Sequence, residues 1–192
     1  MKFEEAKKFI LDKLSNELPK NLTYHSIDHV KDVLGAAAML SEKENITEYD
    51  KSLLLTAALY HDSGFTVTYQ NHEEAGCEIV RKYLPDFEYT EEEIAIICSM
   101  IMATKIPQNP HNLLEQIICD SDLDYLGRND FVEIGNYLFK ELMVHGFIKT
   151  ETEWNLLQIK FLESHRYFTP SSIALRAGLK QENLNKIKAL IK

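Results

Sequence analysis

Two adjacent side chains that can bind a metal, His61 and Asp62, end an apolar stretch covering residues 53–60. A carboxylate and an imidazole are costly to bury side by side unless each finds a partner. One divalent cation would satisfy both groups. The further residues of these types that we take as candidate partners are His25, His29 and Asp122.

The spacing of these candidates predicts that they meet. His25 and His29 are four residues apart, so on or just before a helix they project to the same side. His29 shares its helical face with Val33, and Asp122 follows Ile118 by four residues, so both are expected to face the core. Two imidazoles and two carboxylates would then come together from three helices.

This donor set predicts a divalent cation in octahedral geometry. Mn, Fe, Co or Ni is expected, Mg and Zn are alternatives, and one or two ions are compatible with the pattern. Four protein ligands leave two positions open, for a water and a substrate oxygen. Such an arrangement supports attack of an activated water on phosphorus.

The elements that would position these residues are helices. Apolar residues recur at helical spacing from Phe3 onwards, and only residues 65–71 have any strand character. The start signals that we recognise are Ser26, Thr47, Thr90, Asn109 before Pro110, Thr150, and Thr169 before Pro170. The segments expected to be helical are 3–18, 24–40, 48–60, 72–84, 94–103, 110–127, 134–146, 151–165 and 170–192. The sequence therefore predicts an all-α multi-helix bundle.

Length and composition limit the possible domain organisation and the classes of function. The 192 residues suit one domain over 1–192, with a core from about 20 to 128 and C-terminal helices from 129 to 192 packed on it. A formal charge of -9 argues against nucleic-acid binding. The longest apolar stretch, 94–103, is too short to span a membrane, and the three cysteines form no CxxC pair. We expect a cytoplasmic protein with free thiols, and the sequence gives no oligomeric state.

Three short motifs in order carry a family resemblance. His29, then His61-Asp62, then Asp122 resembles the H…HD…D signature of the HD-domain superfamily of metal-dependent phosphohydrolases. The surrounding residues, Leu59-Tyr-His-Asp-Ser-Gly-Phe65 and Cys119-Asp-Ser-Asp-Leu-Asp-Tyr125, fit as well. The C-terminal pattern from Trp154 to Thr169 is similar to a subgroup of small bacterial HD proteins. The resemblance implies a helical bundle of the phosphodiesterase type.

The resemblance also implies roles for the candidates. His29, His61, Asp62 and Asp122 would ligate the metal, and Asp62 would also hold the attacking water or bridge two ions. The stretch 24–29 resembles the motif of cyclic-nucleotide phosphodiesterases, in which the histidine corresponding to His25 protonates the leaving oxygen. The expected partner is a small phosphate ester or anhydride, and a nucleotide is the substrate class we favour.

The sequence lacks residues that two branches of the superfamily use, so their specific activities cannot be inferred from the resemblance. Phe65 stands where the superfamily's nucleotidases place a catalytic Glu, and the acidic pair of its guanosine tetraphosphate hydrolases is absent. Two alternatives stay open. One is a di-iron oxygenase, for which His72 and His111 are the candidate extra ligands. The other is a non-catalytic domain in which the metal staples helices together and the domain binds a nucleotide or a protein.

Three further residues are candidates for contacting a substrate. Lys105 ends an apolar helix and Arg128 follows Gly127, so either cation could meet a phosphate. A surface Lys that extends along apolar neighbours is the competing interpretation. His72 begins a helix beside Glu73, where a solvated turn is the alternative to a role in the site.

Overall fold

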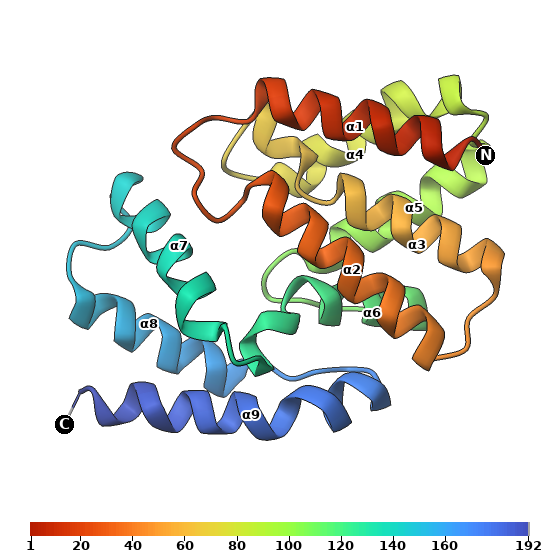
Figure 1. The fold of residues 1–192 in the computed structure, drawn as a ribbon. Coiled ribbons are helices and arrows are strands. Elements are labelled where there is room, and N and C mark those ends of the chain that lie inside the picture. Colours follow the sequence, from red (N-terminus) through yellow and green to blue (C-terminus); the bar gives the residue numbers. More distant parts are fainter. Residues whose placement is uncertain (192) are drawn as a thin grey trace.

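The computed structural model describes residues 1–191, and within that range the regular structure is entirely helical (Figure 1). Short 3-10 turns occur at Ser63–Thr66 (η1), Leu84–Phe87 (η2) and Asp124–Gly127 (η3). The α-helices are α1 (Phe3–Glu17), α2 (Ile27–Lys43), α3 (Glu48–Tyr60), α4 (His72–Tyr83), α5 (Glu91–Thr104), α6 (Leu113–Asp122), α7 (Phe131–Val144), α8 (Glu151–Ser164) and α9 (Pro170–Ala189). The all-α prediction is confirmed. None of the described helices combines the length and apolarity needed to cross a membrane.

Side-chain caps begin most of these helices where the sequence predicts. Thr47 accepts a hydrogen bond from the backbone N–H of Asp50 at 3.1 Å and so begins α3. Thr90 and Glu93 form a reciprocal capping box at the start of α5. Each cap satisfies backbone donors that a helix end leaves free. The remaining caps of this kind are Ser26, Thr150 and Thr169.

Two segments differ in detail from what their sequence pattern suggests. Residues 65–71 form no strand, because the amides of Val67 and Thr68 both donate to the carbonyl of Gly64, at 2.8 and 3.0 Å, within a tight turn. Helix α6 is capped by Asn112 and not by Asn109. The Asn112 side chain accepts from the backbone N–H of Glu115 at 3.0 Å, while Glu115 accepts in return from the backbone N–H of His111.

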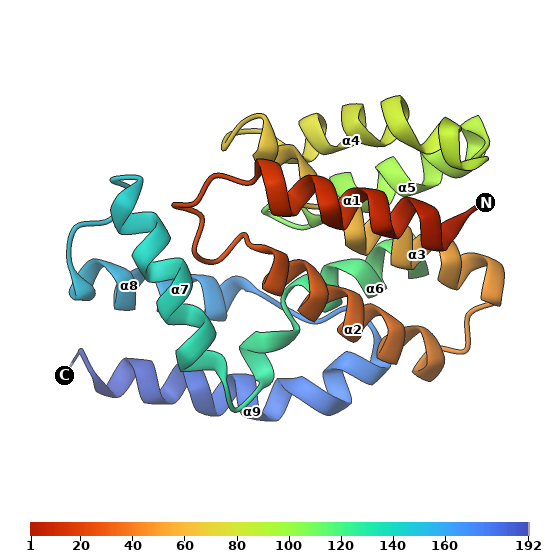
Figure 2. The same ribbon diagram turned by 45° about the horizontal axis from the view of Figure 1, so that its top comes forward.

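Two apolar clusters hold the helices together. The larger one lies among α1–α6 and includes Ile10 and Leu14 of α1, so this first helix belongs to the main core. The smaller one joins η3 to α7, α8 and α9, with Leu126, Phe131 and Leu162 at its centre. Figures 1 and 2 show the same division: α7–α9 lie together on one side of the α1–α6 group.

Gly64 sets the distance between the end of α3 and helix α4. A methyl group on Gly64 would lie 1.8 Å from the carbonyl oxygen of His72 and 2.7 Å from the backbone nitrogen of Gly76. Both contacts are with backbone, which cannot rotate away. Only glycine therefore allows η1 to pack on α4, and this packing holds His72 near the His61-Asp62 pair.

We expect Gly64→Ala to lower the free energy of unfolding by about 3 kcal/mol or more, because overpacking against backbone forces the helices apart. Chemical denaturation followed by circular dichroism measures it. The matched control is Gly178→Ala in α9, where a methyl group meets nothing within 4 Å. There the better helix propensity of Ala should raise stability by about 0.5–1 kcal/mol. Equal stability of the two variants would contradict the role of Gly64.

Candidate metal centre

Four side chains of the H…HD…D signature converge. His29 Nε2 lies 3.1 Å from Asp122 Oδ1 and 3.4 Å from Asp62 Oδ2. His61 Nε2 lies 3.3 Å from Asp62 Oδ2, 3.6 Å from Asp122 Oδ1 and 3.3 Å from His29 Nε2. One ligand atom from each of His29, His61 and Asp122 lies within 4.8 Å of the others, which makes this group a possible metal site.

Helix ends aim these atoms at one point. His29 lies in the first turn of α2, behind the Ser26 cap, and His61 directly follows α3. The Nδ1 of His61 donates to the carbonyl of Ala58 at 2.9 Å, so its Nε2 is the nitrogen left for the cluster. Asp122 is the last residue of α6. The fourth ligand thus arrives from a third helix, as predicted.

The buried carboxylates of the cluster would be stabilised by positive charge beside them. Asp62 and His61 are 5% and 1% exposed, and Asp62 Oδ2 is buried without a hydrogen-bond partner. Burial alone would raise the pKa of Asp62, but the neighbouring histidines, chiefly His61, outweigh burial and lower that pKa. Burial would likewise lower the pKa of His61, but Asp62 and Asp122 raise it. A divalent cation meets this demand with oxygen and nitrogen ligands of suitable type, so the residues fit a metal.

His25 is held by a carboxylate that the sequence reasoning missed. Glu141, fully buried in α7, accepts from the backbone amides of Tyr24 and His25 at 2.9 and 3.1 Å. Its Oε1 lies 2.5 Å from His25 Nδ1, and it also accepts from the Tyr69 hydroxyl at 3.2 Å. Burial lowers the pKa of His25, but the contact with Glu141, together with the charges of Asp62 and Asp122, outweighs burial and raises that pKa.

Phe65 fixes the two histidines that flank the cluster. Its ring stacks on His25 with centroids 4.2 Å apart and on His72 with centroids 3.9 Å apart. His72 Nε2 lies 3.6 Å from Asp62 Oδ1 and 3.5 Å from Glu73 Oε1. Phe65, which stands where related nucleotidases place an acid, therefore acts here as a spacer between two imidazoles.

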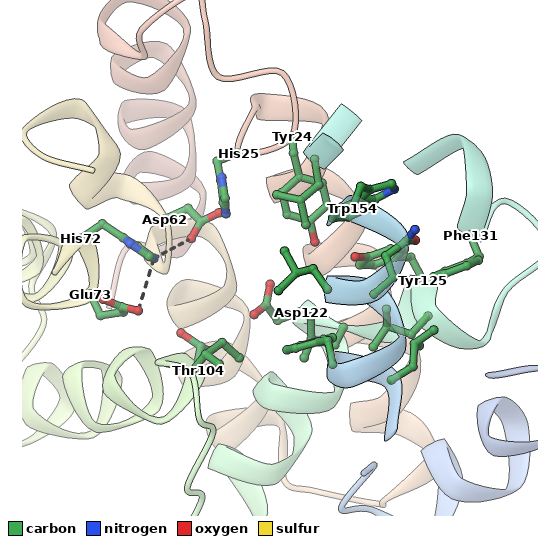
Figure 3. A pocket seen from close by; sticks show the side chains of 18 residues that line it. Tyr24, His25, Asp62, His72, Glu73, Thr104, Asp122, Tyr125, Phe131 and Trp154 are labelled. Atoms are coloured by element: carbon green, nitrogen blue, oxygen red, sulfur yellow. Dashed lines mark ion pairs between the residues drawn. The ribbon is translucent and has the colours of Figure 1, made fainter. Parts of the chain in front are cut away.

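A cavity of about 230 Å³ opens onto these residues. His25, Asp62, His72 and Asp122 line it, so four of the predicted site residues face one space. Figure 3 shows His25, Asp62 and His72 on one side of Asp122, and Tyr24, Tyr125, Phe131 and Trp154 on the other. Phe131 belongs to α7 and Trp154 to α8, whereas Tyr125 lies in η3 and Tyr24 precedes α2.

The two cations predicted to contact a substrate lie outside this cavity. Lys105 binds the carboxylate of Glu74 and donates to Asn71 Oδ1 at 3.2 Å. The Arg128 guanidinium is held by Asp32 at 2.8 Å and Asp130 at 2.7 Å. Acidic neighbours thus engage both charges, and two of them, Asp32 and Glu74, are distant in the sequence.

The two extra histidines considered as ligands, His72 and His111, lie in different places. His72 and Glu73 lie at the cluster, and Glu73 is only 6% exposed although its sequence position suggested solvent. His111 lies in the loop between α5 and α6, just before α6 begins. Its Nε2 is 3.3 Å from the Asn109 amide nitrogen. His111, the second candidate ligand for a di-iron oxygenase, therefore does not line the cavity, whereas His72 does.

A sequence signal for Glu141 does exist. Glu141 follows Ile134 by seven residues and Leu138 by three, so it falls on the apolar face of its helix. A carboxylate at such a position needs partners.

Comparison with known proteins places the chain in a family. Residues 26–124 match the model of the HD domain, and the chain belongs to this family. HD domains form a superfamily of metal-dependent phosphohydrolases, whose members bind divalent metals. A Clostridium beijerinckii protein described as uncharacterized is 32% identical over 84 residues, which are 42% of this chain and 53% of that protein. The chain thus spans about half the length of the curated relative that it matches.

The fold is shared with a solved structure. The crystal structure of a Lactobacillus plantarum protein, a structural genomics target, is similar with a TM-score of 0.64 over 98% of each chain at 18% identity. At this identity the likeness concerns the fold alone.

We expect Mn²⁺ or Ni²⁺ to raise the melting temperature by about 5–10 °C at a concentration near 100 times its Kd, because binding to the folded state alone contributes about 2.7 kcal/mol. A chelator should reverse the shift. Asp122→Asn should abolish it, whereas Asp28→Asn, one residue before His29 with a side chain 95% exposed, should keep it. Scanning fluorimetry with metal analysis measures both, and a shift of equal size in Asp122→Asn would contradict the site.

Proposed function

We propose that this protein hydrolyses a phosphate ester of a small molecule with the help of a divalent metal. The observation that carries the proposal is the meeting of His29, His61, Asp62 and Asp122 at the end of a cavity that Asp62 and Asp122 line. A metal that only stapled helices together would not need access from a cavity. The access supports catalysis over the non-catalytic alternative.

The four residues would hold the cation through two imidazole nitrogens and two carboxylates. When bound, it would supply Lewis-acid polarisation of a phosphoryl oxygen and make a water molecule more acidic. Asp62 has a second oxygen, Oδ1, that faces His72 and not the cluster. We assign to this carboxylate the orientation of the attacking water.

His25 is the proposed general acid. Glu141 engages its Nδ1 and raises the pKa of His25, which favours the protonated imidazole, and Nε2 is the atom free to donate. His25 lines the cavity together with Asp62, which supports a position near the leaving oxygen. Glu141 acts through His25 and is a positioning residue.

The direct test is release of phosphate from phenyl phosphate with Mn, Fe, Co, Ni, Mg or Zn added in turn. Asp62→Ala should remove activity with every ion, because it removes both a ligand and the group that orients water. Full metal content together with full activity in Asp62→Ala would refute the proposal. A nucleotide substrate, favoured by the family resemblance, is tested in the same assay with AMP.

We expect His25→Asn to lower kcat for phenyl phosphate by about 100-fold or more, the usual contribution of a general acid. The loss should be smaller for p-nitrophenyl phosphate, whose leaving group needs no proton. Glu141→Gln should lower kcat less than His25→Asn and change the basic limb of the pH–rate profile. The exposed His111 supplies the control, and His111→Asn should match the wild type. Equal losses for the two substrates would exclude proton donation by His25.

A further inference from the structure

The cavity has two chemically different ends. The acidic end carries Asp62, Glu73 and Asp122 together with the histidines. Towards α7 and α8 the wall is formed almost entirely by apolar and aromatic side chains, which are Leu126, Phe131, Leu138, Trp154, Leu157 and Phe161. Figure 3 shows Trp154, Tyr125 and Phe131 gathered on this side, away from His72 and Glu73.

No lysine or arginine lines the cavity within residues 1–191. A substrate with several phosphates would place negative charge beside carboxylates, with only the metal centre and the histidines to offset it. Lys105 and Arg128 do not relieve this, because their charges are engaged by acidic side chains elsewhere. The cavity therefore suits a single phosphate.

Polar groups that could read a nucleobase are also scarce at the apolar end. Gln158 supplies the one side-chain amide, one N–H of which donates to Asn155 Oδ1 at 3.3 Å, and Trp154 adds a single indole N–H. Burying the edge of a base without hydrogen bonds costs free energy, so an apolar wall disfavours it.

We infer that the apolar end binds an uncharged hydrocarbon group of the substrate, alkyl or aryl, about the size of a benzene ring. This inference rests on the proposed function for the presence of the phosphate. An apolar cavity of about 150 Å³ stays dry and holds benzene. A space of about 230 Å³ therefore accommodates such a ring together with a phosphate at the acidic end. The substrate class is a monophosphate ester of an apolar alcohol or phenol.

Trp154, the chain's one tryptophan, lines the apolar end and reports on its occupancy. We would titrate the protein, with Mn²⁺ present, with phenylphosphonate, methylphosphonate and AMP, using calorimetry for Kd and Trp154 fluorescence for the place of binding. Phenylphosphonate should bind at least about tenfold more tightly than methylphosphonate, since burial of several carbon atoms is worth more than this factor. It should also change the fluorescence.

A matched pair of variants locates the effect. Leu157 and Leu156 are neighbours on α8 with exposed fractions of 42% and 52%, but only Leu157 lines the cavity. Leu157→Asn should reduce the preference for phenylphosphonate over methylphosphonate by about threefold or more. Leu156→Asn should leave that ratio as it is in the wild type.

Equal affinities for the two phosphonates, or tighter binding of AMP than of phenylphosphonate, would overturn the inference. Hydrolysis is scored separately with phenyl phosphate. Preferential binding of phenylphosphonate without any hydrolysis supports the apolar site and refutes the phosphohydrolase proposal. Hydrolysis without any preference for the phenyl group supports the phosphohydrolase proposal and refutes the apolar site.

Discussion

The structure depends on placing two carboxylates and two imidazoles side by side at one end of a cavity, with little of their surface exposed. Asp62 and His61 are almost fully buried, and the ligand atoms of the cluster lie 3.1–3.6 Å apart. Such a group persists in a folded protein only if positive charge is shared among its members. The ends of α2, α3 and α6 meet at this point.

One turn of α6 connects this cluster to the C-terminal helices. Asp122 faces the histidines, while Asp120, fully buried two residues earlier, accepts from the backbone amides of Phe168 and Thr169, each at 2.8 Å. It also accepts from the Thr169 hydroxyl at 2.7 Å. Burial raises the pKa of Asp120 although these donors oppose it. The start of α9 is therefore tied to the same helix end that supplies the fourth candidate ligand.

What the sequence could predict was local or periodic. Helix starts such as Thr47 and Thr90 follow from side chains that cap their own backbone. Helical spacing predicts that His29 and Asp122 face the core, and the resemblance to the H…HD…D signature implies that they meet His61. Pairings between distant segments could not be predicted in this way. Arg128 meets Asp32 from the opposite half of the chain, and Glu141 meets His25 across more than a hundred residues.

The two ends of the cavity come from separate stretches of the chain. His25, Asp62, His72 and Asp122 all precede residue 125, whereas Phe131, Leu138, Trp154 and Leu157 all follow it. Changes in the later stretch can reshape the apolar wall without touching a single metal-binding candidate. Apart from Glu141, which holds His25, the reacting groups and the apolar wall can therefore change separately. A protein that shares the first stretch and Glu141 with this one, but not the apolar wall, would be expected to keep the chemistry and act on something else.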